Sequence, residues 1–379
     1  MFTNEPWSDF RRQMPSAGSW ACFDHAAVAP LSGPGREAIV AWANDLAENG
    51  AANWPRWAER IEKTRRRGAE MIGAEPDEVA LVRSTTEGIN FVAEGFPWRS
   101  GDNIVVPANE FPSNLYPWMH LADRGVDTRR VHVEHGRVRL DALAAACDSR
   151  TRIVAVSWVG YAGGWRMDLD ALVELAHSRG ALLFLDAIQG LGVFPLDVRR
   201  TPVDFLAADG HKWLLGPEGA GLFYLRREHL DLLRPVGVGW NSVVQTLDFS
   251  HIELKIKPAA GRYEGGTYNM AGFAALGASL DLLARYPRAE IAARVLQITD
   301  EICRRLGELV ATVASCRDTG RASGIVAFDL AGQDPSQVRK RCRERRVLLS
   351  CRGGRLRVSP HAYNNDEDIE RLIEALRAG

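Results

Sequence analysis

Lysine is rare in this sequence, and one lysine has an unusual setting. The five lysines among the 47 basic residues are Lys63, Lys212, Lys255, Lys257 and Lys340. Lys212 lies in a glycine-rich segment between two apolar runs, where the charged end of a surface lysine would be out of place. Burial lowers the pKa of an amine, and a neutral amine can form an imine with a carbonyl compound. The segment is therefore typical of a covalent-catalysis lysine, although a loop lysine in a glycine-shaped turn fits this motif equally well.

A carboxylate ends a strongly apolar run upstream of this lysine. Asp186 follows the run 181–185 and so stands at the carboxyl end of an expected strand, where open α/β sheets bind ligands. Such a carboxylate could keep the pyridine nitrogen of pyridoxal 5'-phosphate protonated, so that the ring accepts electrons from a substrate carbanion. Gln189, three residues later, could reach the phenolic oxygen of that cofactor. A strand-end aspartate that only forms a turn is the alternative.

The segment 83–90 offers hydroxyl groups where a strand pattern meets a helix pattern. It reads Arg-Ser-Thr-Thr-Glu-Gly-Ile-Asn. Hydroxyls and the free amides of a helix N-terminus bind phosphate dianions well. An ordinary serine or threonine N-cap followed by a glutamate explains the same residues, so the segment alone leaves both interpretations open.

Taken together, these segments resemble the class V aminotransferase and cysteine desulfurase family of fold type I pyridoxal-phosphate enzymes. The resemblance covers nearly the whole chain and rests on four motifs in the family's order. They are Ser-Thr-Thr-Glu-Gly-Ile-Asn (84–90), Asp-Ala-Ile-Gln (186–189), Gly-His-Lys with Gly-Pro-Glu-Gly (210–219) and Arg-Tyr-Glu-Gly-Gly-Thr (262–267). The stretch Glu-Phe-Pro-Ser-Asn-Leu-Tyr (110–116) is also similar to kynureninase-like and isopenicillin N epimerase-like members.

The resemblance implies a role for each matching residue. Lys212 would be the catalytic lysine that holds the cofactor as a Schiff base, and Arg357 would bind the substrate carboxylate. A strand-edge ion pair is the alternative for Arg357. Thr267 would reach the phosphate of the neighbouring subunit, which implies a homodimer with shared active sites. The cofactor-binding set implied by the resemblance is Thr85, Thr86, Phe111, Asp186, Gln189, His211, Lys212 and Thr267.

Several positions depart from the desulfurase pattern. Phe111 occupies the place of a histidine over the cofactor ring, and a phenyl ring stacks but cannot transfer protons. Asp209 replaces a serine near the phosphate, and Tyr161 replaces an asparagine near the cofactor oxygen, so the roles of both are open. The loop that carries the sulfur-accepting cysteine is missing, and we expect Cys351 to be a packing residue.

The expected reaction is a carbon-sulfur lyase reaction by β-elimination through an external aldimine and a quinonoid, without a persulfide cysteine. Transamination and epimerisation share those intermediates and remain alternatives. A non-enzymatic protein that only binds the cofactor would be expected to lack Lys212 or Arg357, and both residues are present. The substrate is expected to be a small molecule, namely an amino acid.

The apolar runs and helical patterns predict the scaffold that positions these residues. Short runs rich in Val, Ile and Leu alternate with amphipathic stretches, and they lack period-2 alternation, which indicates a mainly parallel sheet covered by helices on both faces. Residues 204–226 read as an antiparallel pair, because their connection is too short for a crossover helix. We expect an α/β fold of type I, with a mainly parallel seven-stranded sheet in a large domain (20–285). A smaller α+β C-terminal domain (286–379) and an N-terminal arm (1–19) packed on it complete the expected chain.

Composition and charge narrow the expected partners. The formal net charge of -1 and the pI near 6.8 provide no basic field for nucleic acid or for an anionic membrane. The six cysteines are scattered without a Cys-x-x-Cys pair, which argues against a disulfide framework and against a zinc or other metal site. The N-terminus lacks a signal-peptide pattern, and no apolar run is long enough to span a membrane. The protein is expected to be cytoplasmic.

Overall fold

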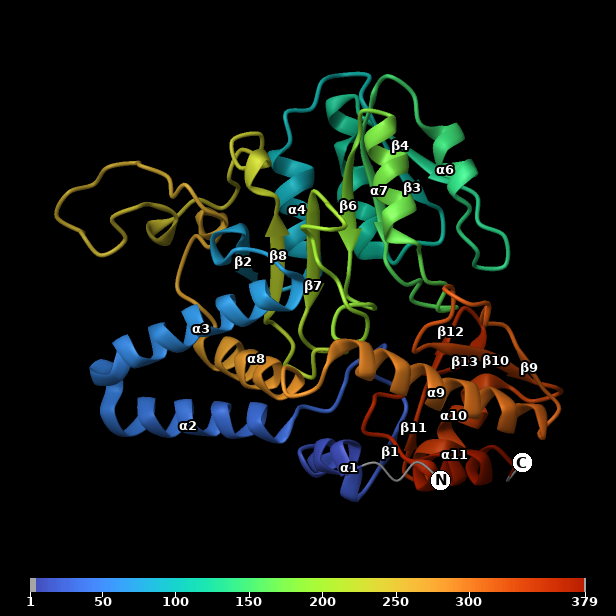
Figure 1. The fold of residues 1–379 in the computed structure, drawn as a ribbon. Coiled ribbons are helices and arrows are strands. Elements are labelled where there is room, and N and C mark those ends of the chain that lie inside the picture. The colour runs from blue at the N-terminus through green and yellow to red at the C-terminus, as the bar shows by residue number, and fades with distance from the viewer. Residues whose placement is uncertain (1–4, 378–379) are drawn as a thin grey trace.

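The computed structural model describes residues 5–377, so residues 1–4 of the expected arm and residues 378–379 of the expected C-terminal domain lie outside the described residues. A seven-stranded sheet forms the centre of the larger part, in the order β2-β8-β7-β6-β5-β3-β4 (Figure 1). Its strands are β2 (Val79–Val82), β3 (Asn103–Pro107), β4 (Asp127–Val131), β5 (Thr151–Ser157), β6 (Leu182–Asp186), β7 (Phe205–Asp209) and β8 (Gly221–Leu225).

The sheet is mainly parallel, as the sequence predicted. Neighbouring strands from β4 across to β7 run parallel, while β8 runs antiparallel to both β7 and β2. The expected antiparallel pair in residues 204–226 is confirmed, with Phe205 opposite Leu225 and Asp209 opposite Gly221. The carboxyl ends of β5, β6 and β7 therefore meet at one edge of the sheet.

Helices cover both faces of this sheet, which explains why its central strands are apolar without alternation. On β5, Val154 and Val156 belong to one hydrophobic cluster, whereas Ile153 and Ala155 belong to the cluster on the other face. The helices of the chain are α1 (Glu5–Arg12), α2 (Gly33–Asn49), α3 (Trp54–Ile72), α4 (Thr85–Gly95), α5 (Tyr116–Met119), α6 (Leu140–Ala146), α7 (Leu169–Ser178), α8 (Met270–Leu283), α9 (Arg288–Gly307), α10 (Pro335–Glu344) and α11 (Asp366–Arg377).

A four-stranded antiparallel sheet, in the order β12-β13-β10-β9, forms the centre of the C-terminal part. Its strands are β9 (Ala311–Val313), β10 (Val326–Leu330), β12 (Ser350–Arg352) and β13 (Arg355–Val358). Apolar residues of β10, β13, α9 and α11 pack into one separate hydrophobic cluster. Helix α9 stops at Gly307, and Val310, just beyond it, has a positive φ of 55°.

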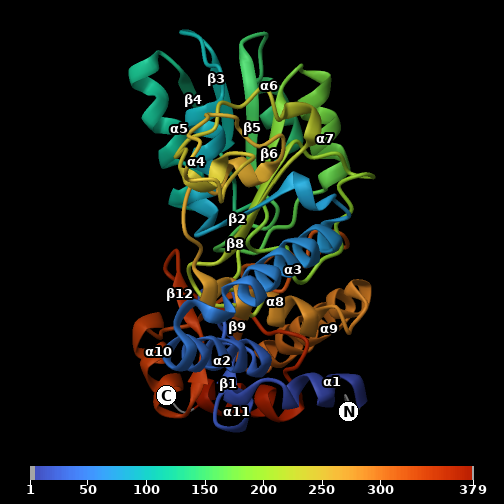
Figure 2. The ribbon, with the colours of Figure 1, turned by 90° about the vertical axis from the view of Figure 1, so that its left-hand side faces the viewer.

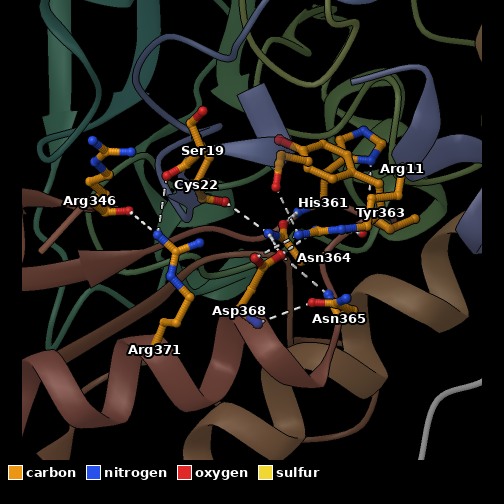
Figure 3. A network of polar contacts seen from close by, with 12 residues as sticks. Arg11, Ser19, Cys22, Arg346, His361, Tyr363, Asn364, Asn365, Asp368 and Arg371 are labelled. Carbon is orange, nitrogen blue, oxygen red and sulfur yellow. Dashed lines mark hydrogen bonds and ion pairs between the residues drawn. The ribbon is translucent and has the colours of Figure 1, made fainter. Parts of the chain in front are cut away.

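The N-terminal segment is tied to the C-terminal part by strand pairing and by a buried ion pair. Strand β1 (Ala21–Cys22) pairs in parallel with β11 (Val347–Leu348). Arg11 on α1 donates from two nitrogens to the buried carboxylate of Asp368 on α11, at 2.6 and 3.1 Å (Figure 3). Asn364 donates to the same carboxylate at 2.8 Å. These contacts fix the start of the chain, so that residues 23–28 cross from the small sheet toward the carboxyl edge of the large one.

Helices α2, α3 and α8 pack together on one side of the molecule, next to a long protruding loop (residues 236–257) (Figure 1). Figure 2, which faces this side, shows α2 and α3 in front. Large apolar side chains are exposed here. They are Val40, Leu46, Trp54, Val238, Trp240, Val244, Leu247, Phe249, Ile252 and Leu254. Among residues 5–377, no helix has the length and apolarity needed to cross a membrane.

Candidate functional site

A cavity of about 240 Å³ lies where the carboxyl ends of β6 and β7 meet the N-terminus of α4. This volume is small for a ligand pocket, since such pockets usually measure about 300 to 1,000 Å³. Eight of the residues singled out in the sequence line it: Thr85, Thr86, Phe111, Asp186, Gln189, His211, Lys212 and Arg357. Segments that are distant in the chain therefore contribute to one cavity.

Asp186 ends β6 and is held there by the neighbouring strand. Its backbone oxygen accepts a hydrogen bond from the amide of Trp158 at 2.9 Å, just beyond the end of β5. One carboxylate oxygen accepts from the amide of Ile188 at 3.1 Å. Burial raises the pKa of Asp186 to about 6, while the Ile188 amide and the charge of Lys212 oppose that rise. A protonated ring nitrogen in the cavity would be a suitable counterion for this buried carboxylate.

Lys212 lies three residues beyond the end of β7, and its side chain is inside the cavity. The residue is 9% exposed, so its side chain does not lie on the surface, although the residue belongs to the connection between β7 and β8. Burial lowers the pKa of Lys212 to about 8, with Asp186 opposing and Arg357 adding to the effect. The ammonium nitrogen lies 5.7 Å from the centre of the Phe111 ring. The cavity therefore holds an amine that is partly neutral near physiological pH and lies close to an aromatic face.

The hydroxyls before and within α4 have separate tasks. Ser84 is the N-cap, and its side chain accepts a hydrogen bond from the amide of Glu87 at 3.1 Å, so the capping interpretation holds for this residue. The hydroxyl of Thr85 accepts from the amide of Asp209 at 2.9 Å, and Thr86 donates to Ser113 at 2.8 Å. The first amides of a helix have no intrahelical partner and favour anions. The two threonines and this helix end form a cradle suited to phosphate.

His211 and Asp209 lie at the same end of the cavity. One carboxylate oxygen of Asp209 accepts from the amide of Gly210 at 2.7 Å, and the other lies 3.1 Å from Nδ1 of His211. That nitrogen is buried and forms no hydrogen bond with any of residues 5–377. Asp209, whose role the sequence left open, thus accepts a backbone hydrogen bond and lies close to the histidine.

Gln189 is oriented by a tryptophan that can only donate. The indole Nε1 of Trp213 donates to Oε1 of Gln189 at 2.8 Å, which requires the amide oxygen to face the indole. Nε2 donates to the backbone oxygen of Ala26 at 2.9 Å and keeps one further hydrogen. That hydrogen is available to an oxygen acceptor in the cavity.

Arg357 on β13 reaches the cavity from the small sheet. Its Nε donates to Ser350 at 3.0 Å, Nη1 to the backbone oxygen of Tyr161 at 2.5 Å, and Nη2 to Asp24 at 3.4 Å. Arg357 therefore forms an ion pair with Asp24, although β13 is an inner strand of its sheet and not an edge strand. Burial lowers the pKa of Arg357 to about 10. The ring of Tyr161 contacts the ring of Phe111 edge-on, with centroids 5.2 Å apart. Tyr161 therefore contacts both the guanidinium of Arg357, through its backbone oxygen, and the ring of Phe111.

Two other residues discussed from the sequence, Thr267 and Cys351, lie outside this cavity. Thr267 is exposed and does not line it. Cys351 alternates on β12 with Ser350 and Arg352, packs against the small-domain cluster, and donates from its thiol to the backbone of Pro335 at 3.2 Å. Burial raises the pKa of this thiol, which makes it a poor nucleophile.

Sequence reasoning missed two parts of the cavity wall. Residues 26–28 line it from the N-terminal segment, and Arg352 lines it from β12. Small apolar residues carry no chemical signature, and Arg352 is one of many arginines in the C-terminal part. Only the preserved order of family motifs could have drawn attention to either.

The donor set fits pyridoxal 5'-phosphate. The buried amine of Lys212 could bond to the aldehyde, and the buried carboxylate of Asp186 could pair with the ring nitrogen. The free amide hydrogen of Gln189 could reach the phenolic oxygen, and the N-terminus of α4 with its two threonines could bind the phosphate. Nδ1 of His211, which has no hydrogen-bond partner among the described residues, adds a further polar group at the phosphate end. Phe111 supplies an apolar face for a planar ring.

Comparison of this chain with known proteins supports pyridoxal 5'-phosphate as the cofactor. The family model described as Aminotransferase class-V matches residues 52–372. A probable cysteine desulfurase of Methanothermobacter thermautotrophicus is 32% identical, over 97% of this chain and 96% of that protein. The apo structure of a cysteine desulfurase from Thermococcus onnurineus NA1 superposes with a TM-score of 0.89 at 25% identity, over 99% of this chain and 98% of that one. The cystine C-S lyase C-DES, in complex with its product cysteine persulfide, has a TM-score of 0.90 at 25% identity, over 96% and 99%. The chain therefore belongs to the class V aminotransferase family of pyridoxal-phosphate-dependent enzymes.

Proposed function

We propose that this enzyme breaks the carbon-sulfur bond of a cysteine-like amino acid by β-elimination, without forming a persulfide on one of its own cysteines. The carrying observation is the composition of the cavity wall. It combines the buried amine of Lys212 with Asp186 and Arg357, and it contains no thiol among the described residues. Bound there, the cofactor would supply an electron sink for the α-carbon of the substrate.

Lys212 is the residue proposed to move protons. It would hold the cofactor through its side-chain amine, and the neutral amine would remove the proton from the substrate α-carbon. A pKa of about 8 leaves a useful neutral fraction near pH 7, as a general base requires. Phe111 has no exchangeable proton, so proton transfer on that side of the cavity is not available to it. Its task is to cover the ring and exclude water.

The other residues position the reactants. Arg357 would bind the α-carboxylate through a planar guanidinium fork. Asp186 would keep the ring nitrogen protonated, since a buried carboxylate gains most from an adjacent cation. Thr85, Thr86 and His211 would hold the phosphate and so fix the ring between Phe111 and the end of β6.

The packing and the raised pKa of Cys351 are the reasons why we propose that the enzyme has no persulfide carrier. In the sequence Cys351 is the cysteine nearest to Arg357, but its side chain packs into the small-domain core and its thiol has a raised pKa. All six cysteines are free, and none lines the cavity. Sulfur would therefore leave with the departing half of the substrate. Free thiols also suit a reducing compartment such as the cytoplasm, which we propose as the location.

A homodimer with shared active sites is part of the proposal. Helices α2 and α3 lie on one side of the chain (Figure 2). These helices and the protruding loop carry exposed apolar side chains, whose contact with water is unfavourable. Thr267 follows Glu264, whose buried carboxylate accepts from Arg65 at 2.8 Å and from Tyr268 at 2.6 Å. This anchoring presents the exposed Thr267 in a defined position on the same side of the chain, suited to a phosphate of the neighbouring subunit.

Product analysis tests the reaction. β-Elimination consumes a substrate with a C–S bond and one water, and releases the thiol or persulfide half, pyruvate and ammonia in equal amounts. Purified enzyme incubated with cysteine and with cystine should release pyruvate and ammonia at matching rates, with no sulfur added to the protein by mass spectrometry. Amine transfer to a 2-oxo acid, or formation of the D-amino acid without pyruvate, would contradict the proposal and favour transamination or epimerisation.

A further inference from the structure

Three neighbouring strands of the large sheet end beside the cavity, and each is followed or ended by a polar side chain. Glu110 follows β3, Ser157 ends β5 and Asp186 ends β6, with Ser157 opposite Asp186 in the register of the two strands. The two oxygens of the Glu110 carboxyl group accept hydrogen bonds from Ser157, one from its amide at 2.7 Å and one from its hydroxyl. One serine therefore joins the positions of the two carboxyl groups.

Neither carboxyl group is paired with a cation, although both are buried. Glu110 is 8% exposed and Asp186 is 2% exposed. Within residues 5–377, the contacts of both groups are hydrogen bonds, and neither group forms an ion pair. The charge of Lys212 acts on Asp186 from the cavity without direct contact. Two like charges buried next to each other are unfavourable, so one of the two groups should keep a proton unless a cation arrives.

Glu110 is the group that keeps its proton more readily. Burial raises its pKa to about 7, the two hydrogen bonds from Ser157 oppose that rise, and the negative charge of Asp186 adds to it. Burial raises the pKa of Asp186 to about 6. Of the other groups that act on this pair, Ser157 and Asn114 do not ionise, whereas Lys212 does.

We infer that Glu110 is a positioning residue for the cofactor ring that acts through Asp186, because its carboxylate charge strengthens the hold of Asp186 on a protonated ring nitrogen. The inference goes beyond the proposed reaction and rests on the role proposed there for Asp186. The coupling is reciprocal, since a cation on the ring nitrogen favours the ionised form of Glu110 by as much as ionised Glu110 favours that cation. Cofactor binding near neutral pH should therefore release the proton that Glu110 holds in the cofactor-free protein.

Proton release on cofactor binding tests this without turnover. We would titrate the cofactor-free protein with pyridoxal 5'-phosphate by calorimetry, in buffers of different ionisation enthalpy, to obtain the number of protons released. At pH 7 about half of the Glu110 groups carry a proton, so the parent should release up to about half a proton more than Glu110→Gln. That difference should vanish by about pH 9, where Glu110 is ionised before the cofactor binds.

Two further variants separate the charge of Glu110 from its structural contacts. Ser157→Ala removes a hydroxyl that stabilises the ionised carboxyl group, so the pH at which the extra release disappears should rise by about one unit or more. Glu174→Gln removes an exposed carboxylate of α7 and should release as many protons as the parent. If Glu110 only held β5 and Phe111 in place, its variants would change the thermal midpoint or the cofactor affinity, but not the proton count.

Equal proton release by the parent and Glu110→Gln between about pH 6 and 8 would overturn the inference, as would the same reduction in Glu174→Gln. If Glu110→Gln failed to bind the cofactor, Ser157→Ala would decide, and an unmoved pH dependence would be the contradicting result. Asp186→Asn tests the underlying proposal separately, because it should also lose the extra release. If Asp186→Asn instead matched the parent in proton release and in cofactor absorbance, the role of Asp186 would be wrong and both proposals would fall.

Discussion

Replacing Arg357 with glutamine should separate substrate binding from cofactor binding. The change removes a guanidinium that contacts Ser350, the backbone of Tyr161 and Asp24, but none of the residues proposed to hold the phosphate or the ring nitrogen. Asp24 would lose its cationic partner. Burial already raises the pKa of Asp24, and Arg357 opposes that rise, so the variant should accept a proton on Asp24 instead of burying an unpaired charge.

The expected loss follows from the geometry of the site. A bidentate, charge-assisted contact with a carboxylate is worth about 2 to 4 kcal/mol, which corresponds to a fall of about thirtyfold to a thousandfold in kcat/KM. Protonation of Asp24 limits the additional cost to folding. Arg355→Gln is the matched control, because Arg355 lies on the same strand and its exposed pair with Asp329 should contribute at most about 1 kcal/mol.

The assay measures kcat/KM from pyruvate release, together with cofactor absorbance per subunit and the thermal midpoint. We expect Arg357→Gln to keep its cofactor and lose turnover, mainly through KM, and Arg355→Gln to match the parent in both. A kcat/KM within about threefold of the parent would refute the carboxylate role, since loss of a contact of the expected strength lowers kcat/KM by much more than threefold. Loss of cofactor in proportion to activity would instead place Arg357 in cofactor binding or folding.

Three further predictions follow from other parts of the molecule. Cys351→Ser should leave turnover within a few-fold of the parent, because the thiol packs away from the cavity, and a persulfide found on Cys351 by mass spectrometry would contradict the reaction proposed here. Chains carrying Lys212→Ala and Thr267→Ala, each inactive alone, should recover activity when mixed and exchanged, since one intact site can form across the dimer; no recovery after confirmed exchange would argue against shared sites. Burial lowers the pKa of His361 to about 3, so the folded protein resists a proton that the unfolded chain binds below about pH 6.5. Between pH 6.5 and 5, urea unfolding should therefore show a loss of stability about 2 kcal/mol larger in the parent than in His361→Asn, and equal losses would be evidence against a neutral buried ring.

The sequence was informative where chemistry and strand order coincide. The antiparallel connection between β7 and β8 followed from its length alone. Seven of the eight site residues line one cavity because they follow strand ends or begin a helix, and those positions converge in a parallel sheet. The eighth, Arg357, lies within β13 of the antiparallel sheet. The motif that contains Lys212 left its exposure undecided, and the tertiary structure shows that the side chain is buried.

The remaining features depend on contacts that no local pattern encodes. Residues 26–28 reach the cavity only because β1 pairs with β11, a partner more than 300 residues away in the chain. Arg355 and Arg352 differ in their partners, because Asp329 on the adjacent strand β10 lies where it pairs with Arg355. Strand β9 begins just beyond the end of α9 at Gly307, and the backbone between them turns through Val310 with a positive φ.

The central claim is that Lys212 carries the cofactor, and borohydride reduction tests it most directly. The purified enzyme should be yellow, and reduction should bleach the band while fixing the cofactor to one peptide. Lys257 is the informative competitor, because burial lowers its pKa as well, but its amine donates to Asn241 at 3.2 Å outside the cavity. Peptide mapping should find the adduct on Lys212 alone, and Lys212→Ala should remain unlabelled. An adduct on Lys257 or another lysine, or persistent labelling of Lys212→Ala, would contradict the account.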